Sequence, residues 1–230
     1  MEQTLSRTES SEAVSDAGWR FLLGTLRTSV PVGSLAEGAQ IASRAVEVGG
    51  EYADQHLLVD LRPSRVILTL QSREHAAVTT RDVELAHQIS AVVEEAGSRT
   101  DPDLSPEAPR SVQFLEIGID AMDIAAIRPF WKAALGYAPE AEADGPTDPL
   151  IDPLGQGPAI WFQQMDHPRP QRNRIHLDIS VPHDEAPHRL KAALAAGGRL
   201  LSEVRAPAFW VLADPEGNEA CITTWQGRDN

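Results

Sequence analysis

Polar side chains that could act in acid–base or metal chemistry alternate with apolar ones in the segment RIHLDISV, residues 174–181. Its odd-numbered residues are all apolar, whereas His176, Asp178 and Ser180 are polar. Because successive residues of a strand point to opposite faces, this pattern predicts a strand that packs against helices on one side. Its other side would present His176, Asp178 and Ser180 to a cleft.

The same alternation places further reactive groups on strand faces. Glu219, Cys221 and Thr223 share one side of a predicted strand, and Trp161 and Gln163 share a side of another. Histidine, glutamate and cysteine together could bind zinc. A single cysteine is more often a small buried hydrophobe, so these residues alone leave both interpretations open.

Composition excludes several classes of function. The chain has 230 residues, 42% of them hydrophobic, and a formal net charge of −14. Nucleic acids and anionic membranes require clustered Lys and Arg, so we expect neither as a partner. One cysteine excludes an internal disulfide and a multi-thiolate zinc site. The start of the chain lacks an apolar signal core, and cytoplasmic localisation is expected.

Two breaks divide the chain. Residues 1–15 are rich in Ser and Glu and are expected to form a disordered arm. The stretch GSRTDPDLSPEAPR contains three prolines and few apolar residues, which is typical of a linker, placed at residues 98–110. The chain is therefore predicted to hold one domain at residues 16–97 and another at residues 111–226.

The elements expected in the first domain follow the order ββαββα, which predicts a sheet with helices on one face. Its first helix carries Leu35, Ala39, Ala42 and Val46 at helical spacing. The second helix starts near Thr79 or Thr80. In the second domain, strand–helix–strand patterns occur twice, and two βαβββ units imply paired half-barrels. The fold class is therefore predicted to be α+β.

Residues 18–96 resemble the pterin-4a-carbinolamine dehydratase family through GW at residues 18–19, LRTSVPVGSLAEG and VILTLQSREHAAVTTRDVELAHQIS. That family dehydrates a 4a-hydroxy-tetrahydropterin with histidines acting as general acid and base. The resemblance implies that Glu51 fills an acidic position, His56 the second histidine of a His-His-Pro motif, and Asp82 an aspartate that opens the last helix. A tetrahydropterin-like ligand is the cofactor-like molecule it suggests.

Three positions depart from that family's pattern. Gln55 replaces the first histidine, Leu57 the proline and Arg73 a third histidine, although His75 lies on the same side of an extended segment as Arg73. Glutamine cannot exchange a proton near neutral pH, and arginine stays protonated. We therefore expect an accessory, inactive domain; an active lyase that uses His56 is the alternative.

Residues 111–226 are similar to the vicinal-oxygen-chelate superfamily, in its glyoxalase-like branch, through DAMDIAAIRPFWKAALGY, NRIHLDISVP and FWVLADPEGNEACI. The resemblance implies four metal-ligand positions, filled here by Glu116, Gln163, His176 and Cys221. This set matches the ligands of Mg, Mn, Fe or Ni poorly. We therefore expect no divalent metal and no bound cofactor.

The second domain is expected to provide a metal-free cleft lined by aromatic and polar side chains: Trp161, Trp210, Glu116, Gln163, His176, Glu219 and Cys221. The first hypothesis for its function is a small-molecule-binding protein or a metal-independent enzyme of lyase or isomerase type. A non-catalytic protein that sequesters a drug or metabolite is the alternative. The expected partners are a small-molecule ligand and a second copy of the chain, which would form a homodimer.

Overall fold

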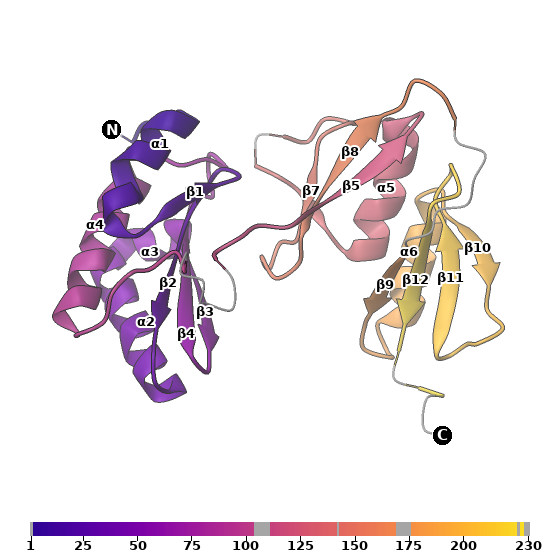
Figure 1. Ribbon diagram of the computed structural model, residues 1–230. Coiled ribbons are helices and arrows are strands. Elements are labelled where there is room, and N and C mark those ends of the chain that lie inside the picture. Colours follow the sequence, from indigo (N-terminus) through magenta and orange to yellow (C-terminus); the bar gives the residue numbers. More distant parts are fainter. Residues whose placement is uncertain (1, 104–110, 142, 169–175, 225, 228–230) are drawn as a thin grey trace. The chain divides into compact units, whose positions relative to one another are not determined.

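The computed structural model describes residues 2–103, 111–141, 143–168, 176–224 and 226–227. The chain forms two compact units, Met1–Phe114 and Leu115–Asn230 (Figure 1). The described parts of the predicted linker, up to residue 103, belong to the first unit, and residues 111–114 also belong to it rather than to the second domain. Residues 104–110 lie outside the described part. In the described part, no helix is both long and apolar enough to cross a membrane.

The predicted ββαββα order is present in the first unit, preceded by a helix that the sequence analysis did not predict. Its four strands form one sheet in the order β1-β2-β4-β3. Its elements, in chain order, are α1 (Arg7–Val14), η1 (Ser15–Ala17), β1 (Arg20–Leu22), β2 (Thr25–Pro31), α2 (Leu35–Gly49), η2 (Gly50–Tyr52), α3 (Ala53–His56), β3 (Leu57–Arg62), β4 (Arg65–Leu70) and α4 (Thr80–Glu95).

The expectation of a disordered arm at residues 1–15 is wrong for the part that forms α1. Ser6 begins this helix with a capping box: its hydroxyl accepts from the Glu9 N–H, and the Glu9 carboxylate accepts from the Ser6 N–H. Val14 at the other end is fully buried in the core of the first unit. A low apolar content therefore did not prevent the segment from folding, because one well-placed side chain anchors it.

Helix α2 faces the sheet through a different stripe from the one the spacing suggested. Its buried residues are Gly38, Ile41, Ala45 and Gly49. A Cβ atom on Gly38 would lie 3.3 Å from Leu61 and 3.4 Å from Val66, so the missing side chain is what allows α2 to approach the sheet closely. The larger apolar residues of the predicted stripe remain on the outside, with Leu35 54% and Val46 48% exposed.

The second unit contains the predicted duplication. The first βαβββ unit comprises β5 (Glu116–Ala121), α5 (Ile124–Leu135), β6 (Ala138–Pro139), β7 (Leu150–Ile151) and β8 (Ala159–Gln164). The second comprises β9 (Leu177–Ser180), α6 (Ala186–Ala195), β10 (Arg199–Ser202), β11 (Phe209–Ala213) and β12 (Glu219–Thr223).

Both repeats have the same strand order, β5-β8-β7-β6 and β9-β12-β11-β10, and in each the first strand runs parallel to the last. One apolar core spans the two repeats and contains Phe130, Trp131, Ile160, Leu212 and Ile222. The α+β class and the paired βαβββ architecture predicted from the sequence are therefore confirmed.

Candidate functional site

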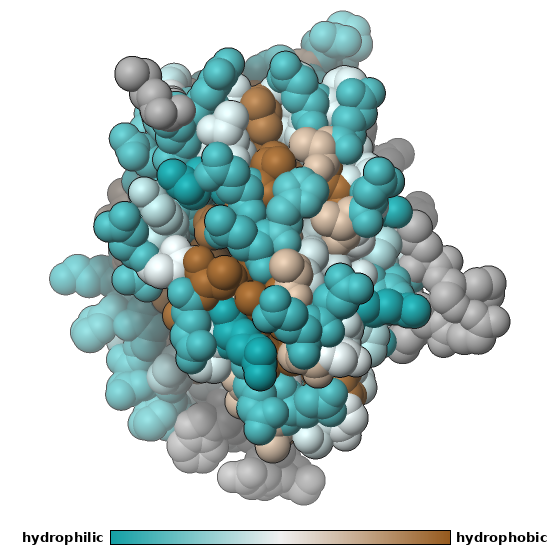
Figure 2. Space-filling view, turned by 90° about the vertical axis from the view of Figure 1, so that its left-hand side faces the viewer, coloured by the Kyte–Doolittle hydropathy of each residue, from teal (hydrophilic) through white to brown (hydrophobic). Residues whose placement is uncertain are grey.

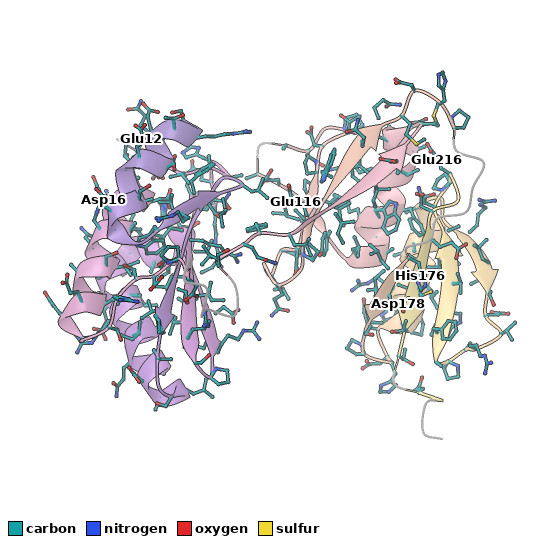
Figure 3. The ribbon with its side chains drawn as sticks, in the orientation of Figure 1. Glu12, Asp16, Glu116, His176, Asp178 and Glu216 are labelled. Carbon is teal, nitrogen blue, oxygen red and sulfur yellow. The ribbon has the colours of Figure 1, made fainter. Side chains whose placement is uncertain are left out.

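The clearest group of reactive side chains in the second unit lies on one face of the β9–β12 strand pair. Cys221 on β12 lies beside Asp178 on β9 in the parallel register, and His176 immediately precedes β9. The His176 Nδ1 atom is 3.0 Å from an Asp178 carboxylate oxygen, and the Cys221 thiol is hydrogen-bonded to the same carboxylate. Figure 3 shows His176 and Asp178 next to each other at this sheet.

Strand alternation accounts for this arrangement. Leu177 and Ile179 of β9 pack against the core, so His176 and Asp178 point to the other side, where both are about half exposed. Cys221 lies deeper, only 7% exposed. The face thus presents an accessible imidazole and carboxylate above a buried thiol.

The environment of Cys221 keeps its thiol protonated. Burial, the hydrogen bond to Asp178 and the negative charges of Asp178 and Glu219 together raise the pKa of Cys221 to about 11. A thiol with this pKa is a poor nucleophile at neutral pH. Without a cation, Cys221 therefore acts as a hydrogen-bond donor to Asp178.

The expectation that this cleft takes no metal is corrected by the structure. One ligand atom from each of His176, Asp178 and Cys221 lies within 4.8 Å of the other two. Imidazole nitrogen, carboxylate oxygen and thiolate sulfur are the ligands that zinc uses in proteins. The expectation rested on the poor match of Glu116, Gln163, His176 and Cys221 to metal ligands, but the β9–β12 register adds a carboxylate, that of Asp178, beside Cys221.

The other residues predicted for the cleft lie on the sheet of the first repeat. In the β5–β8 register Glu116 lies beside Ala159, whereas Gln163 lies beside Asp120. Glu116 and Gln163 are thus four residues apart along the sheet, about 13 Å at the usual rise per residue. The group of ligand atoms around Cys221 does not include Glu116, which Figure 3 shows on the other sheet.

The two aromatic residues predicted to line the cleft, Trp161 and Trp210, have different environments. Trp161 is 38% exposed, and its indole lies across Gly118, where a Cβ atom would come within 3.0 Å of the ring. Trp210 packs against the apolar core, on the same side of the sheet as Ile222, so it does not share the face of His176 and Cys221. Glu219 does share that face, two residues before Cys221.

In the first unit, His56 is buried and bound to Asp82. The His56 Nδ1 atom is 2.9 Å from one oxygen of Asp82, and the other Asp82 oxygen accepts from the N–H and the hydroxyl of Thr79. Glu2, which the sequence analysis did not single out, lies 3.7 Å from the His56 Nε2 atom. Glu51, by contrast, is exposed in the short helix η2.

The three positions that depart from the dehydratase pattern line a single pocket. Gln55, Leu57 and Arg73 are joined there by Val46, Ala53, Asp54 and Val59, around a volume of about 420 Å³. The backbone brings them together, since the N–H of Arg73 donates to the carbonyl of Gln55 at 3.0 Å. His56 is not among the lining residues.

Comparison with known proteins identifies the second unit. The sequence profile of the glyoxalase-like domain family matches residues 116–223. Residues 116–223 form a glyoxalase-like domain. The glyoxalase-like domain therefore contains both βαβββ repeats and the group His176, Asp178 and Cys221.

Solved structures similar to parts of the chain include two of this kind. A glyoxalase/bleomycin resistance protein from Albidiferax ferrireducens T118 is 18% identical and covers 48% of this chain and 97% of its own, with a TM-score of 0.37. The fosfomycin resistance protein FosX from Listeria monocytogenes is 11% identical and covers 52% of this chain and 95% of its own, with a TM-score of 0.40.

A third similar structure is a transcriptional coactivator/pterin dehydratase from Brucella melitensis. It is 22% identical and covers 39% of this chain and 98% of its own, with a TM-score of 0.36. A comparison with curated protein sequences returned no match.

Proposed function

We propose that the glyoxalase-like domain binds a small molecule with the help of a divalent cation, zinc by the nature of its ligands, held by His176, Asp178 and Cys221. The observation that carries this proposal is the convergence of three different ligand atoms within 4.8 Å of one another. The exposed His176 and Asp178 leave the site open to a ligand from solvent.

The protein side chains have separate roles in this proposal. Asp178 accepts hydrogen bonds from both neighbours, so it fixes the orientation of the imidazole and the thiol. Cys221 would lose its proton when the cation binds, so affinity should rise with pH. A bound cation would supply Lewis-acid polarisation of a ligand oxygen. Whether the domain binds a metabolite or also converts it, as a lyase or isomerase, depends on that ligand.

Zinc binding to the full chain tests the proposal. After chelator treatment and zinc titration, we expect about one zinc per chain by elemental analysis and a higher melting temperature. Cys221→Ser and His176→Ala should each weaken binding at least about tenfold, as expected for the loss of a ligand. His188→Ala is the matched control, because this histidine is exposed on α6, outside the site. Stoichiometric binding unchanged by both site variants would overturn the proposal, as would no binding at all.

We propose that the first unit is an accessory, pterin-dehydratase-like domain without turnover. Gln55 and Arg73 line the pocket in place of titrating side chains, and the imidazole of His56 is held by Asp82 in the protein interior. A specific observation keeps the active lyase as a second candidate. The buried pair His56–Asp82 has the geometry of an oriented base, and Glu2 lies near its second nitrogen.

We also propose that the chain forms a homodimer through the first unit. The outward stripe of α2, formed by the exposed Leu35, Ala39 and Val46 and the half-buried Ala42, is apolar along three turns of the helix. Figure 2 shows apolar patches between hydrophilic side chains on the helical side of this unit. Two copies of the same stripe could bury each other around a two-fold axis.

A further inference from the structure

The face of the first unit's sheet that points away from its helices holds polar and charged residues. In the β2–β4–β3 register, Ser29 lies beside Ile67, which lies beside Asp60, while Arg65 lies beside Arg62. The helical side of the same strands carries core residues such as Val30, Leu68 and Val66, so strand alternation turns this second set outward.

The chain that follows α4 packs against this face. Ser29 and Asp101 exchange two backbone hydrogen bonds, of 3.0 and 2.7 Å. Arg65 forms an ion pair with Asp103, and Arg27 lies 4.8 Å from the ring of Phe114. The described residues on both sides of residues 104–110 therefore contact the sheet itself.

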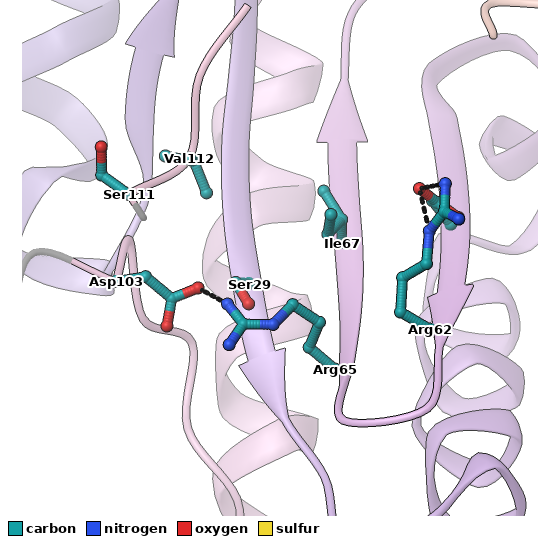
Figure 4. Close-up of a pocket in the computed structure, with 8 residues that line it drawn as sticks. Ser29, Arg62, Arg65, Ile67, Asp103, Ser111 and Val112 are labelled. Carbon is teal, nitrogen blue, oxygen red and sulfur yellow. Dashed lines mark hydrogen bonds and ion pairs between the residues drawn. The ribbon is translucent and has the colours of Figure 1, made fainter. Parts of the chain in front are cut away.

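A pocket of about 260 Å³ lies between the sheet and the described residues Asp103, Ser111 and Val112 (Figure 4). Its lining residues are Ser29, Asp60, Arg62, Arg65, Ile67, Asp103, Ser111 and Val112. Figure 4 shows the side chain of Arg65 extending across the sheet toward Ser29 and Asp103.

The hydroxyl of Ser29 is the unusual feature of this pocket. Ser29 is 1% exposed, and its Oγ atom is the one buried side-chain polar atom, among the described residues, that has no hydrogen-bond partner. Burying a hydroxyl without a partner is unfavourable, and alanine would fill the same space without that cost. A buried, unpaired hydroxyl that lines a pocket indicates that the partner enters from the pocket.

The charged side chains that line this pocket indicate which chemistry the partner has. The acids are already compensated, because Asp60 accepts from the Nε and Nη2 atoms of Arg62 and Asp103 is paired with Arg65. A guanidinium has five N–H donors, so both arginines keep donors that these pairs do not use. The unused N–H donors of Arg65, together with the Ser29 hydroxyl, can bind a carboxylate, and Ile67 and Val112 add apolar contact surface.

We propose that this pocket is a binding site for a small carboxylic acid, whose carboxylate accepts from the Ser29 hydroxyl and from Arg65. The site belongs to the first unit. It is separate from the pocket lined by Gln55 and Arg73 and from the group around Cys221. It would give the first unit a ligand of its own even if that unit has no dehydratase activity.

The proposal is tested by titrating the full, zinc-free chain with butyrate, succinate and benzoate. The methyl NMR signals of Ile67 and Val112 report binding. We expect saturable shifts with at least one acid, and none with butyramide or with sodium chloride at equal ionic strength. Ser29→Ala and Arg65→Gln should each weaken binding about tenfold or more, as expected for a charge-assisted hydrogen bond. Ser43→Ala and Arg44→Gln, both exposed on α2, are the matched controls and should bind like the wild type.

The melting temperature without ligand gives a second readout, because Arg65→Gln also disturbs the pair with Asp103. Ser29→Ala should melt at the same temperature as the wild type or above it, since it removes an unpaired buried hydroxyl. The carboxylate should then raise the melting temperature of the wild type but not of Ser29→Ala. Absence of saturable binding by all three acids, or a lower melting temperature of ligand-free Ser29→Ala, would overturn the proposal.

Discussion

The indole N–H of Trp131 donates a hydrogen bond of 3.0 Å to the fully buried carboxylate of Asp214. Trp131 belongs to α5 in the first repeat, and Asp214 follows β11 in the second, so this bond joins the two halves of the glyoxalase-like domain. Asp214 also accepts from the backbone N–H groups of Glu216 and Asn218 and from the Asn218 amide. Glu216 belongs to the same turn, and its carboxylate accepts from two backbone N–H groups just before α5.

Removal of the indole N–H should destabilise the glyoxalase-like domain. We expect Trp131→Phe to lower the free energy of unfolding by about 1.5–3 kcal/mol, the usual range for a hydrogen bond to a charged group. Asp214→Ala should cost more, because four donors lose their acceptor. Urea denaturation followed by circular dichroism measures both, with the exposed Trp161→Phe as control. A loss for Trp131→Phe no larger than that of the control would show that the bond does not couple the repeats.

The alkaline pKa of Cys221 can be measured directly, because the chain has one cysteine. In the metal-free protein, we expect the iodoacetamide reaction rate to rise with a midpoint near the pKa of about 11 rather than the ordinary value of 9.0. Because folding raises this pKa, the protonated thiol contributes stability below about pH 9. That contribution is lost as pH rises toward 11.

Asp178→Asn separates the causes of this shift. It removes a negative charge and a carboxylate acceptor beside the thiol, so the pKa of Cys221 should fall toward its ordinary value. Asp184→Asn, which changes a carboxylate outside this group, is the control. A midpoint unaffected by Asp178→Asn would mean that burial and the charge of Glu219, not Asp178, set the pKa of Cys221.

The first unit should dehydrate 4a-hydroxy-tetrahydropterin at or near the uncatalysed rate. Each missing acid–base group is worth about 10²–10⁴-fold in rate. Gln55→His combined with Arg73→His restores titrating groups to the pocket and should raise the rate, as measured by stopped-flow absorbance. High activity of the wild type that His56→Ala abolishes would instead establish the active lyase.

Dimerisation through α2 predicts that a charge in its exposed stripe separates the copies. Light scattering should give twice the chain mass of 25.0 kDa for the wild type and a single chain mass for Leu35→Asp combined with Val46→Asp. Val204→Asp is the control, since Val204 is 88% exposed in the other unit. A wild-type monomer, or a dimer that survives the double substitution, would rule out this interface.

Strand periodicity was enough to predict much of the fold and which candidate residues share a strand face. As predicted, His176 and Asp178 share one face of their strand and Glu219 and Cys221 share one face of theirs, because a period of two leaves only one way to bury the intervening residues. Asp178 was expected on the cleft face with His176, but not among the metal ligands. Strand register, which places it beside Cys221, cannot be deduced from either strand alone.

Other features depend on contacts between distant segments. The burial of Ser29 follows from a backbone bridge to Asp101, and no local pattern around Ser29 indicates it. The inward face of α2 was misassigned because large apolar residues were expected inside, whereas Gly38 permits the closest approach. In contrast, the helix at residues 7–14 could have been found from Ser6 and Glu9, which have the spacing of a capping box.

Asp82 stabilises the fold of the first unit, and this role does not depend on any catalysed reaction. It closes the capping box of α4 with Thr79, while its other oxygen holds the imidazole of His56 in the interior. Replacing Asp82 would remove the cap of α4 and leave the buried imidazole of His56 without this hydrogen-bond partner. Both effects would occur whether or not the protein binds a pterin. The requirements of folding alone are thus sufficient to explain Asp82 and His56 at these positions. An aspartate and a histidine at positions that match an enzyme family are therefore, by themselves, no evidence of that family's reaction.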